Sequence, residues 1–173
     1  MFHNWAGSPD LKEKGQAVYD RFRDVDTGLL PGALILTLDG EIPVEQARIG
    51  DSLITRDSGV AKITHVQTVT RPCHVILVPT FTFGVGAPGA QSLLAADQMI
   101  LLRGTTARAY LDCATALVTA RGLCAEEGVE DLGQQDTTLH QIFCAAPHIL
   151  YCDGLELSTA DGARARGKAL DAA

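Results

Sequence analysis

From Leu29 onward the sequence consists of short apolar runs, many of them rich in β-branched residues, and most of the runs end at a turn signal. The runs are "ALILTL" (33–38), "SLITR" (52–56), "VAKITHVQTV" (60–69) and "HVILVPTFTF" (74–83), and the turn signals include Asp39-Gly40, Asp57-Ser58-Gly59 and Arg71-Pro72. This spacing is typical of strands that are joined by tight turns. The sequence therefore predicts a body built almost entirely of β-strands.

Three segments require separate treatment. Residues 9–25 place apolar side chains at helical spacing after Pro9, which predicts a short amphipathic helix before the β body. Residues 107–123 fit either a helix or a strand followed by a short helical turn, and propensity leaves both open. Residues 137–144 and 148–152 are two apolar runs separated by Ala-Ala-Pro, which predicts a hairpin.

A length of 173 residues with 46% apolar residues is enough for one sizeable core. We expect an N-terminal helical appendage at 1–27, a single domain at 28–159 and a C-terminal tail at 160–173. The tail, "ADGARARGKALDAA", is small and polar, which is typical of a flexible terminus.

Charge and cysteine content exclude several classes of function. The net charge is -7, and the 14 Lys and Arg residues are scattered, so we expect neither nucleic acid nor an anionic membrane as a main partner. No apolar run is long enough to cross a bilayer and the N-terminus lacks a secretory signal, so the expected location is cytoplasmic. Five cysteines without a CxxC pair indicate buried thiols rather than disulfides or a ribbon-type zinc site.

Three blocks, taken in order, give the sequence a family resemblance. They are "GLLPGALILTLDGEIPVEQARIGDSLITRD" (28–57), "SLLAADQMILL" (92–102) and "PHILYCDGLELST" (147–159). Together they resemble the Hint domains, the self-processing modules of inteins and hedgehog proteins, and most closely a bacterial subgroup. The resemblance implies an all-β horseshoe of curved strands whose two halves are related by an approximate two-fold repeat.

The resemblance also identifies the positions that should carry chemistry. In the family, an N-terminal Cys attacks the carbonyl before it, and a Thr and a His of the second block polarise that bond. The matching positions here are Gly28, Ala95 and Gln98. Glycine has no nucleophile, alanine has no hydroxyl, and a glutamine amide does not exchange protons as imidazole does. Loss of general acid–base catalysis alone costs roughly 10²- to 10⁴-fold in rate.

The third block leads to the same interpretation. Splicing inteins end in His-Asn, whose Asn cyclises, whereas this chain has Ser158-Thr159. The block retains His148, which we interpret as a hydrogen-bonded structural histidine. The resemblance therefore implies a degenerate domain that neither cleaves itself nor splices, and that serves as a structural or binding module for an unidentified protein, without a cofactor.

Two alternatives remain open at this stage. The first is an active autoprocessing domain that cleaves near residues 26–28, with the Thr27 hydroxyl attacking the Asp26 carbonyl. The second is a metal-binding β module. His140, Cys144, His148 and Cys152 recur every fourth residue. Because residues four apart on a strand lie about 13 Å from each other, only a cross-strand pair such as Cys144 with His148 could share an ion.

Overall fold

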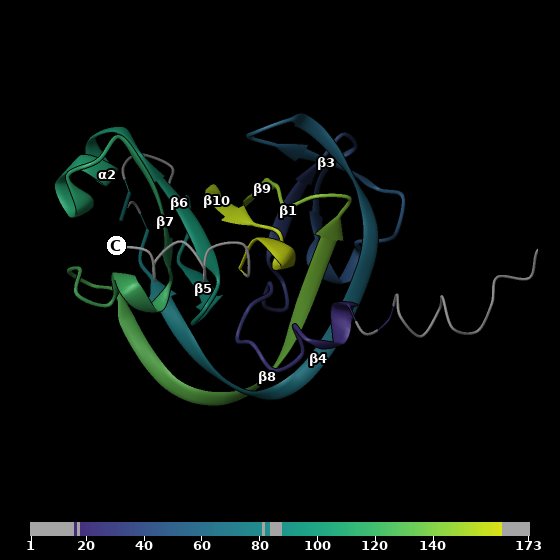
Figure 1. Cartoon of the computed structure of the whole chain (residues 1–173). Coiled ribbons are helices and arrows are strands. Elements are labelled where there is room, and N and C mark those ends of the chain that lie inside the picture. The colour runs from purple at the N-terminus through teal and green to yellow at the C-terminus, as the bar shows by residue number, and fades with distance from the viewer. Residues whose placement is uncertain (1–15, 17, 81, 84–87, 164–173) are drawn as a thin grey trace, which may run out of the picture.

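The computed structural model describes residues 16, 18–80, 82–83 and 88–163, and the described chain forms one curled antiparallel sheet (Figure 1). Its strands are β1 (Leu34–Thr37), β2 (Gly40–Pro43), β3 (Ser52–Thr55), β4 (Gly59–Val78), β5 (Ser92–Ala95), β6 (Met99–Arg103), β7 (Thr115–Thr119), β8 (Glu130–Cys144), β9 (Ile149–Cys152) and β10 (Leu155–Ser158). The order along the sheet is β5-β4-β3-β1-β9-β10-β6-β7, with β2 on β1 and β8 on β4. The all-β prediction is confirmed.

Two long strands, β4 and β8, form the base of the molecule and bend around the other strands (Figure 1). They pair antiparallel from Ile63 opposite Cys144 to Leu77 opposite Glu130, with register shifts at Ile63/His65 and His74/Ile76. Extra residues in a ladder bend a strand and increase its twist. These irregularities accompany the curvature that lets one sheet enclose its own core.

The helical elements are short. They are η1 (Val44–Gln46), α2 (Gly104–Leu111), η2 (Arg121–Leu123) and η3 (Ala160–Ala163). Residues 107–123 combine both expected structures, because α2 ends at Leu111, Asp112 follows it in the left-handed conformation, and β7 and η2 come next. Residues 18–20, at the predicted N-terminal helix, are helical, and residues 9–15 and 17 lie outside the described residues. No described helix is both long and apolar enough to span a membrane.

The hairpin predicted for 137–144 with 148–152 is wrong. The first segment belongs to β8 and pairs with β4, whereas β9 pairs with β10 across Asp153-Gly154 and with β1 and β3. Pro147 supplies no N–H to a ladder. The backbone of Ile149 instead bonds to Arg56 N–H and the Asp57 carboxylate, which fixes β9 beside β3.

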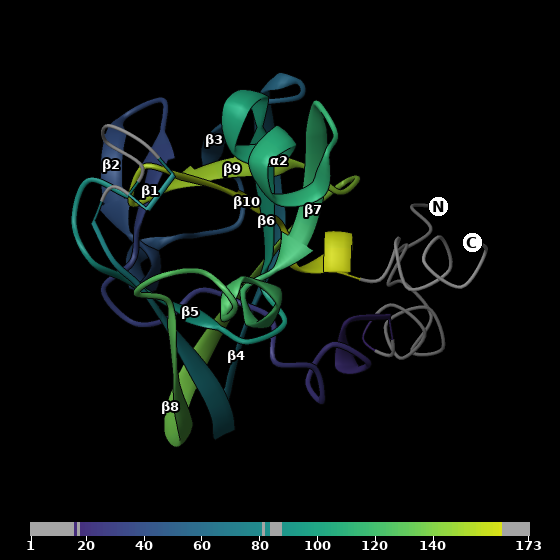
Figure 2. The ribbon, with the colours of Figure 1, turned by 90° about the vertical axis from the view of Figure 1, so that its left-hand side faces the viewer.

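Side chains from most strands fill the interior of the curled sheet. The largest of the fully buried ones include Ile35, Leu53, Ile63, Ile100, Leu150 and Leu157. Two smaller clusters lie beside this core, one with Leu30, Cys73, Val75, Ala95 and Leu139, the other with Phe22, Phe143 and Ala160. The second joins the segment before residue 28 to η3, and Figure 2 shows both on the same side of the sheet.

Candidate functional site

Side chains and backbone from all three sequence blocks meet at the Thr27–Gly28 peptide. The carbonyl oxygen Oε1 of Gln98 accepts a hydrogen bond from Gly28 N–H at 3.2 Å and from the Thr27 hydroxyl at 3.5 Å. The Gln98 amide nitrogen donates to Ser158 O at 2.9 Å and to Met99 O at 3.1 Å. Gln98, only 1% exposed, therefore ties the three blocks together through one buried side chain.

A tight turn between β5 and β6 positions Gln98. Gln98 N–H bonds back to Ala95 O at 3.0 Å, and the Gln98 carbonyl accepts from Ala120 N–H at 2.9 Å. Ala95, fully buried at the end of β5, packs in the small cluster with Leu30 and Leu139. These bonds fix the backbone of residue 98 in the turn, and its buried side chain is held by its own hydrogen bonds to Gly28 and Ser158.

A second glutamine, Gln141, contacts the other side of the same peptide. Its amide nitrogen donates to Thr27 O at 2.9 Å and to Phe22 O at 2.7 Å, and its oxygen accepts from Gln67 at 2.6 Å. Sequence reasoning missed this residue. Alternation along β8 places Gln141 on the same face as Leu139 and Phe143. A polar residue among apolar ones on that face could have indicated a buried hydrogen-bonding role.

A side chain at position 28 would be crowded and would strain the backbone. The φ of Gly28 is 131°, a conformation that L-residues rarely adopt, and a Cβ would lie 3.1 Å from Gln141 Cγ and 3.2 Å from both His140 O and Leu139 Cβ. Reciprocal bonds between Leu29 and His140, of 2.9 and 2.8 Å, hold this backbone against β8. The close approach of the two backbones and the positive φ therefore favour glycine at position 28.

Cys73 has a thiol that lies beside Asp26, just before the junction. It is fully buried, and burial, reinforced by the Asp26 carboxylate, raises its pKa to about 11. Its thiol donates to His74 O at 3.2 Å, while the His74 imidazole pairs with Asp131 at 3.0 Å. Cys73 therefore stays protonated at neutral pH, and the neighbouring Asp26 carboxylate disfavours its thiolate.

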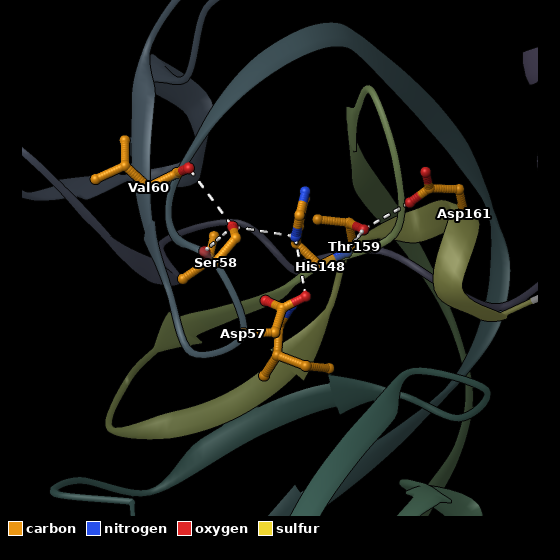
Figure 3. Close-up of polar contacts among 8 residues, drawn as sticks. Asp57, Ser58, Val60, His148, Thr159 and Asp161 are labelled. Carbon is orange, nitrogen blue, oxygen red and sulfur yellow. Dashed lines mark hydrogen bonds and ion pairs between the residues drawn. The ribbon is translucent and has the colours of Figure 1, made fainter.

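His148 lies in a separate polar cluster (Figure 3). Its Nδ1 contacts Asp57 Oδ2 at 2.9 Å and Ser58 Oγ at 3.3 Å. In a Ser-His-Asp triad the serine and the aspartate bind opposite ring nitrogens, so this arrangement is not one. The backbone of His148 bonds to Thr159 in both directions, and the Thr159 hydroxyl donates to Asp161 at 2.5 Å.

This polar cluster is partly open to solvent, with 19% of the His148 side chain and 42% of the Asp57 side chain exposed. Partial burial alone would raise the pKa of Asp57, but hydrogen bonds from Ile149 N–H and His148 outweigh it and hold that pKa below its usual value. Burial raises the pKa of Asp161. A cavity of about 220 Å³ adjoins the cluster, between β7, β9 and η3, and its lining includes Leu117, His148 and Gly162.

Among the described residues, no three His, Cys, Asp or Glu side chains are grouped so that they could hold a metal ion. Cys144 pairs with Ile63 at the end of β8, and burial raises its thiol pKa to about 11. A metal ligand must lose that proton. The His148 imidazole contacts Asp57 and Ser58, so the proposed Cys144–His148 pair gains no support from the geometry.

Comparisons with known proteins identify the family and the fold. Residues 27–161 match the family model described as the Hint domain. No curated protein matches the sequence. The bacterial intein-like domain from Clostridium thermocellum superimposes with a TM-score of 0.52 at 12% identity, over 77% of this chain and 98% of that one. A DnaB intein from Synechocystis sp. PCC 6803 gives 0.49 at 9% identity, over 76% and 96%. The chain belongs to the Hint domain family.

Proposed function

We propose that this chain is a Hint domain that no longer cleaves itself. It stays joined to its upstream segment and acts as a structural or binding module. The observation that carries the proposal is the orientation of Gln98. Breaking the bond between residues 27 and 28 requires a proton on the leaving Gly28 nitrogen. Gln98 presents an acceptor oxygen to that nitrogen, and its own amide hydrogens bind Ser158 and Met99.

The absence of a nucleophile at position 28 supports the same conclusion. Gly28 carries no side chain, and a Cβ there would lie 3.1 to 3.2 Å from atoms of β8, closer than an ordinary van der Waals contact. The nearby thiol of Cys73 is protonated, and a thiol attacks a carbonyl as the thiolate. The Thr27 carbonyl accepts from Gln141, but polarisation of a carbonyl without an attacking group leaves the amide intact.

The C-terminal block supports loss of splicing. Ser158 and Thr159 stand where splicing inteins have His-Asn, and a hydroxyl side chain cannot form the cyclic imide that releases an intein. Both residues have structural contacts instead, because Ser158 O binds Gln98 and the Thr159 hydroxyl links His148 to Asp161.

A second candidate function is cleavage before Thr27. The Asp26 carbonyl accepts from Asp97 N–H at 2.9 Å, a contact that would stabilise an oxyanion, and the Thr27 hydroxyl lies 3.5 Å from Gln98 Oε1. A neutral amide oxygen does not take up the hydroxyl proton at neutral pH. Any such cleavage would therefore be slow.

The proposal includes a partner and a location. We expect a protein partner, because the net charge of -7 with scattered basic residues disfavours nucleic acid and anionic membranes. We expect the protein to act in the cytoplasm, where its free thiols would remain reduced.

The test is the intact mass of the purified full chain after overnight incubation with dithiothreitol or hydroxylamine. The proposal predicts a single species of 18.3 kDa. A fragment that begins at Gly28 would overturn it. A fragment that begins at Thr27 would support the second candidate, and the Thr27→Val variant, which lacks the hydroxyl, should then remain whole.

A further inference from the structure

The segment immediately before the junction, Tyr19–Thr27, is held mainly through its backbone carbonyl groups. Five of these carbonyls accept hydrogen bonds from other parts of the chain: Tyr19 O from Gln67 (2.9 Å), Phe22 O from Gln141 (2.7 Å), Arg23 O from Arg71 (3.2 Å), Asp26 O from Asp97 N–H (2.9 Å) and Thr27 O from Gln141 (2.9 Å). Hydrogen bonds of this kind recognise the backbone of the bound segment, and selectivity for its side chains must come from other contacts.

Three of the donor residues, Gln67, Arg71 and Gln141, lie on β4 and β8 at the base of the sheet. Gln67 on β4 is 7% exposed, Gln141 on β8 is fully buried, and a 2.6 Å hydrogen bond connects their amides. Buried amide hydrogens without acceptors are costly. The segment supplies those acceptors, so the two glutamines form a receptor for a chain with free carbonyls.

Two aromatic side chains, three residues apart, anchor the segment. The Tyr19 ring stacks on His65 at a centroid distance of 3.8 Å and an angle of 13°. Phe22, 5% exposed, packs edge-on against Phe143 at 5.2 Å and lies in one cluster with Ala160 of η3. An ion pair between Arg71 and Asp26 at 3.3 Å adds charge complementarity near the junction.

We propose that this surface, which we call the clasp (His65, Gln67, Arg71, Gln141 and Phe143), is a peptide-binding site. Its ligand is a segment that presents backbone carbonyls and two aromatic side chains spaced three residues apart. In the intact chain the clasp is occupied by the chain's own Tyr19–Thr27. The domain thus retains its upstream segment by binding as well as by the covalent bond, a property independent of whether the junction is cleaved.

The test uses the full chain and a fluorescent peptide with the sequence of residues 18–27. In the wild type the tethered segment has a millimolar effective concentration and outcompetes the peptide. The full-chain variant Tyr19→Ala with Phe22→Ala weakens only the tethered segment and so vacates the clasp. We expect this variant to bind the peptide at least about tenfold more tightly than the wild type does.

Matched controls separate specific binding from adhesion to an exposed apolar surface. Adding Gln141→Glu to the double variant removes the two donated hydrogen bonds and should abolish peptide binding, whereas Gln135→Ala, an exposed change on the same strand, should not. A peptide with Tyr19→Ala and Phe22→Ala should not bind. If the folded double variant fails to bind the wild-type peptide, the proposal is overturned.

A second measurement applies if the double variant does not fold. Trypsin cleaves after Arg21 and Arg23 within the bound segment. In the wild type we expect these bonds to be cut at least about tenfold more slowly than in the single variant Phe22→Ala, because cleavage requires the segment to leave the clasp. Equal rates would show that the segment is not held and would contradict the proposal.

Discussion

The junction at residues 27–28 and the cluster around His148 differ in chemistry although the family resemblance places reaction steps at both. The junction is contacted by neutral amides that are almost completely buried, Gln98 and Gln141. The His148 cluster is partly exposed to solvent and contains two carboxylates. Asp57 contacts the imidazole directly, and Asp161 is connected to the His148 backbone through the Thr159 hydroxyl. At the junction, the side chains that contact the peptide can form hydrogen bonds but cannot exchange protons. At the His148 cluster, the ionisable side chains connect neighbouring loops.

This contrast predicts that disruption of the junction costs stability at all pH values. The His148 cluster should contribute less, and its contribution should depend on pH, because Asp57 titrates and the two glutamines do not.

The largest effect should come from Gln98→Ala. This change leaves Gly28 N–H, Ser158 O and Met99 O without their buried partner, so we expect a loss of about 3 kcal/mol or more in the free energy of unfolding. The melting temperature should fall by about 10 °C. The exposed change Gln135→Ala should stay within about 0.5 kcal/mol. If the two substitutions lowered the free energy of unfolding equally in urea, the hydrogen bonds of Gln98 would not be an important source of stability.

A smaller loss is expected from Gly28→Ala, about 2 kcal/mol, because the new Cβ meets β8 and the backbone adopts a positive φ. Gly32→Ala is the matched control, since Gly32 has a φ of 83° and open space around it, and should cost about 1 kcal/mol. The difference between the two losses in unfolding free energy measures the cost of the close contacts between a Cβ at position 28 and β8. A larger loss for Gly32→Ala would mean that residue 28 has room for a side chain.

The same crowding limits restoration of activity. The triple change Gly28→Cys, Ala95→Thr and Gln98→His introduces a thiol, a hydroxyl and an imidazole, so intact-mass measurement should show slow, thiol-dependent cleavage before residue 28. Misplacement of reacting groups by about 1 Å costs roughly 100-fold in rate. Gly28→Cys alone should remain uncut, and rapid cleavage by that single variant would show that Gln98 does not block the reaction.

The smallest effect should come from His148→Ala, about 1 kcal/mol at neutral pH, because the pair with Asp57 is partly exposed. Since the pKa of Asp57 lies below its usual value, its contribution is present above that usual value and is lost as the pH falls through the folded-state pKa. Wild type and variant should therefore converge in acid-unfolding curves. The pair His74–Asp131 provides a control, because His74 is more exposed than His148 (35% against 19%), and His74→Ala should cost less.

Sequence pattern revealed the strands and the meeting of Gly28 with Gln98, because both follow from local runs and from the order of three motifs. It did not reveal Gln67 and Gln141. Their contact joins residues 74 positions apart, and it depends on the pairing of β4 with β8, which no local signal specifies. The incorrect hairpin has the same origin, since the partner of residues 137–144 lies far away in sequence rather than across the next turn.

The role of Gln98 can be tested most directly by hydrogen exchange at the Gly28 amide, measured by NMR on the full chain. Gln98→Met keeps the length of the side chain and removes the acceptor. We predict that the Gly28 amide is protected in the wild type and that in Gln98→Met it exchanges at least about tenfold faster relative to the core amide of Leu150. Free exchange in the wild type, or an unchanged ratio in the variant, would contradict the account of a junction held by Gln98.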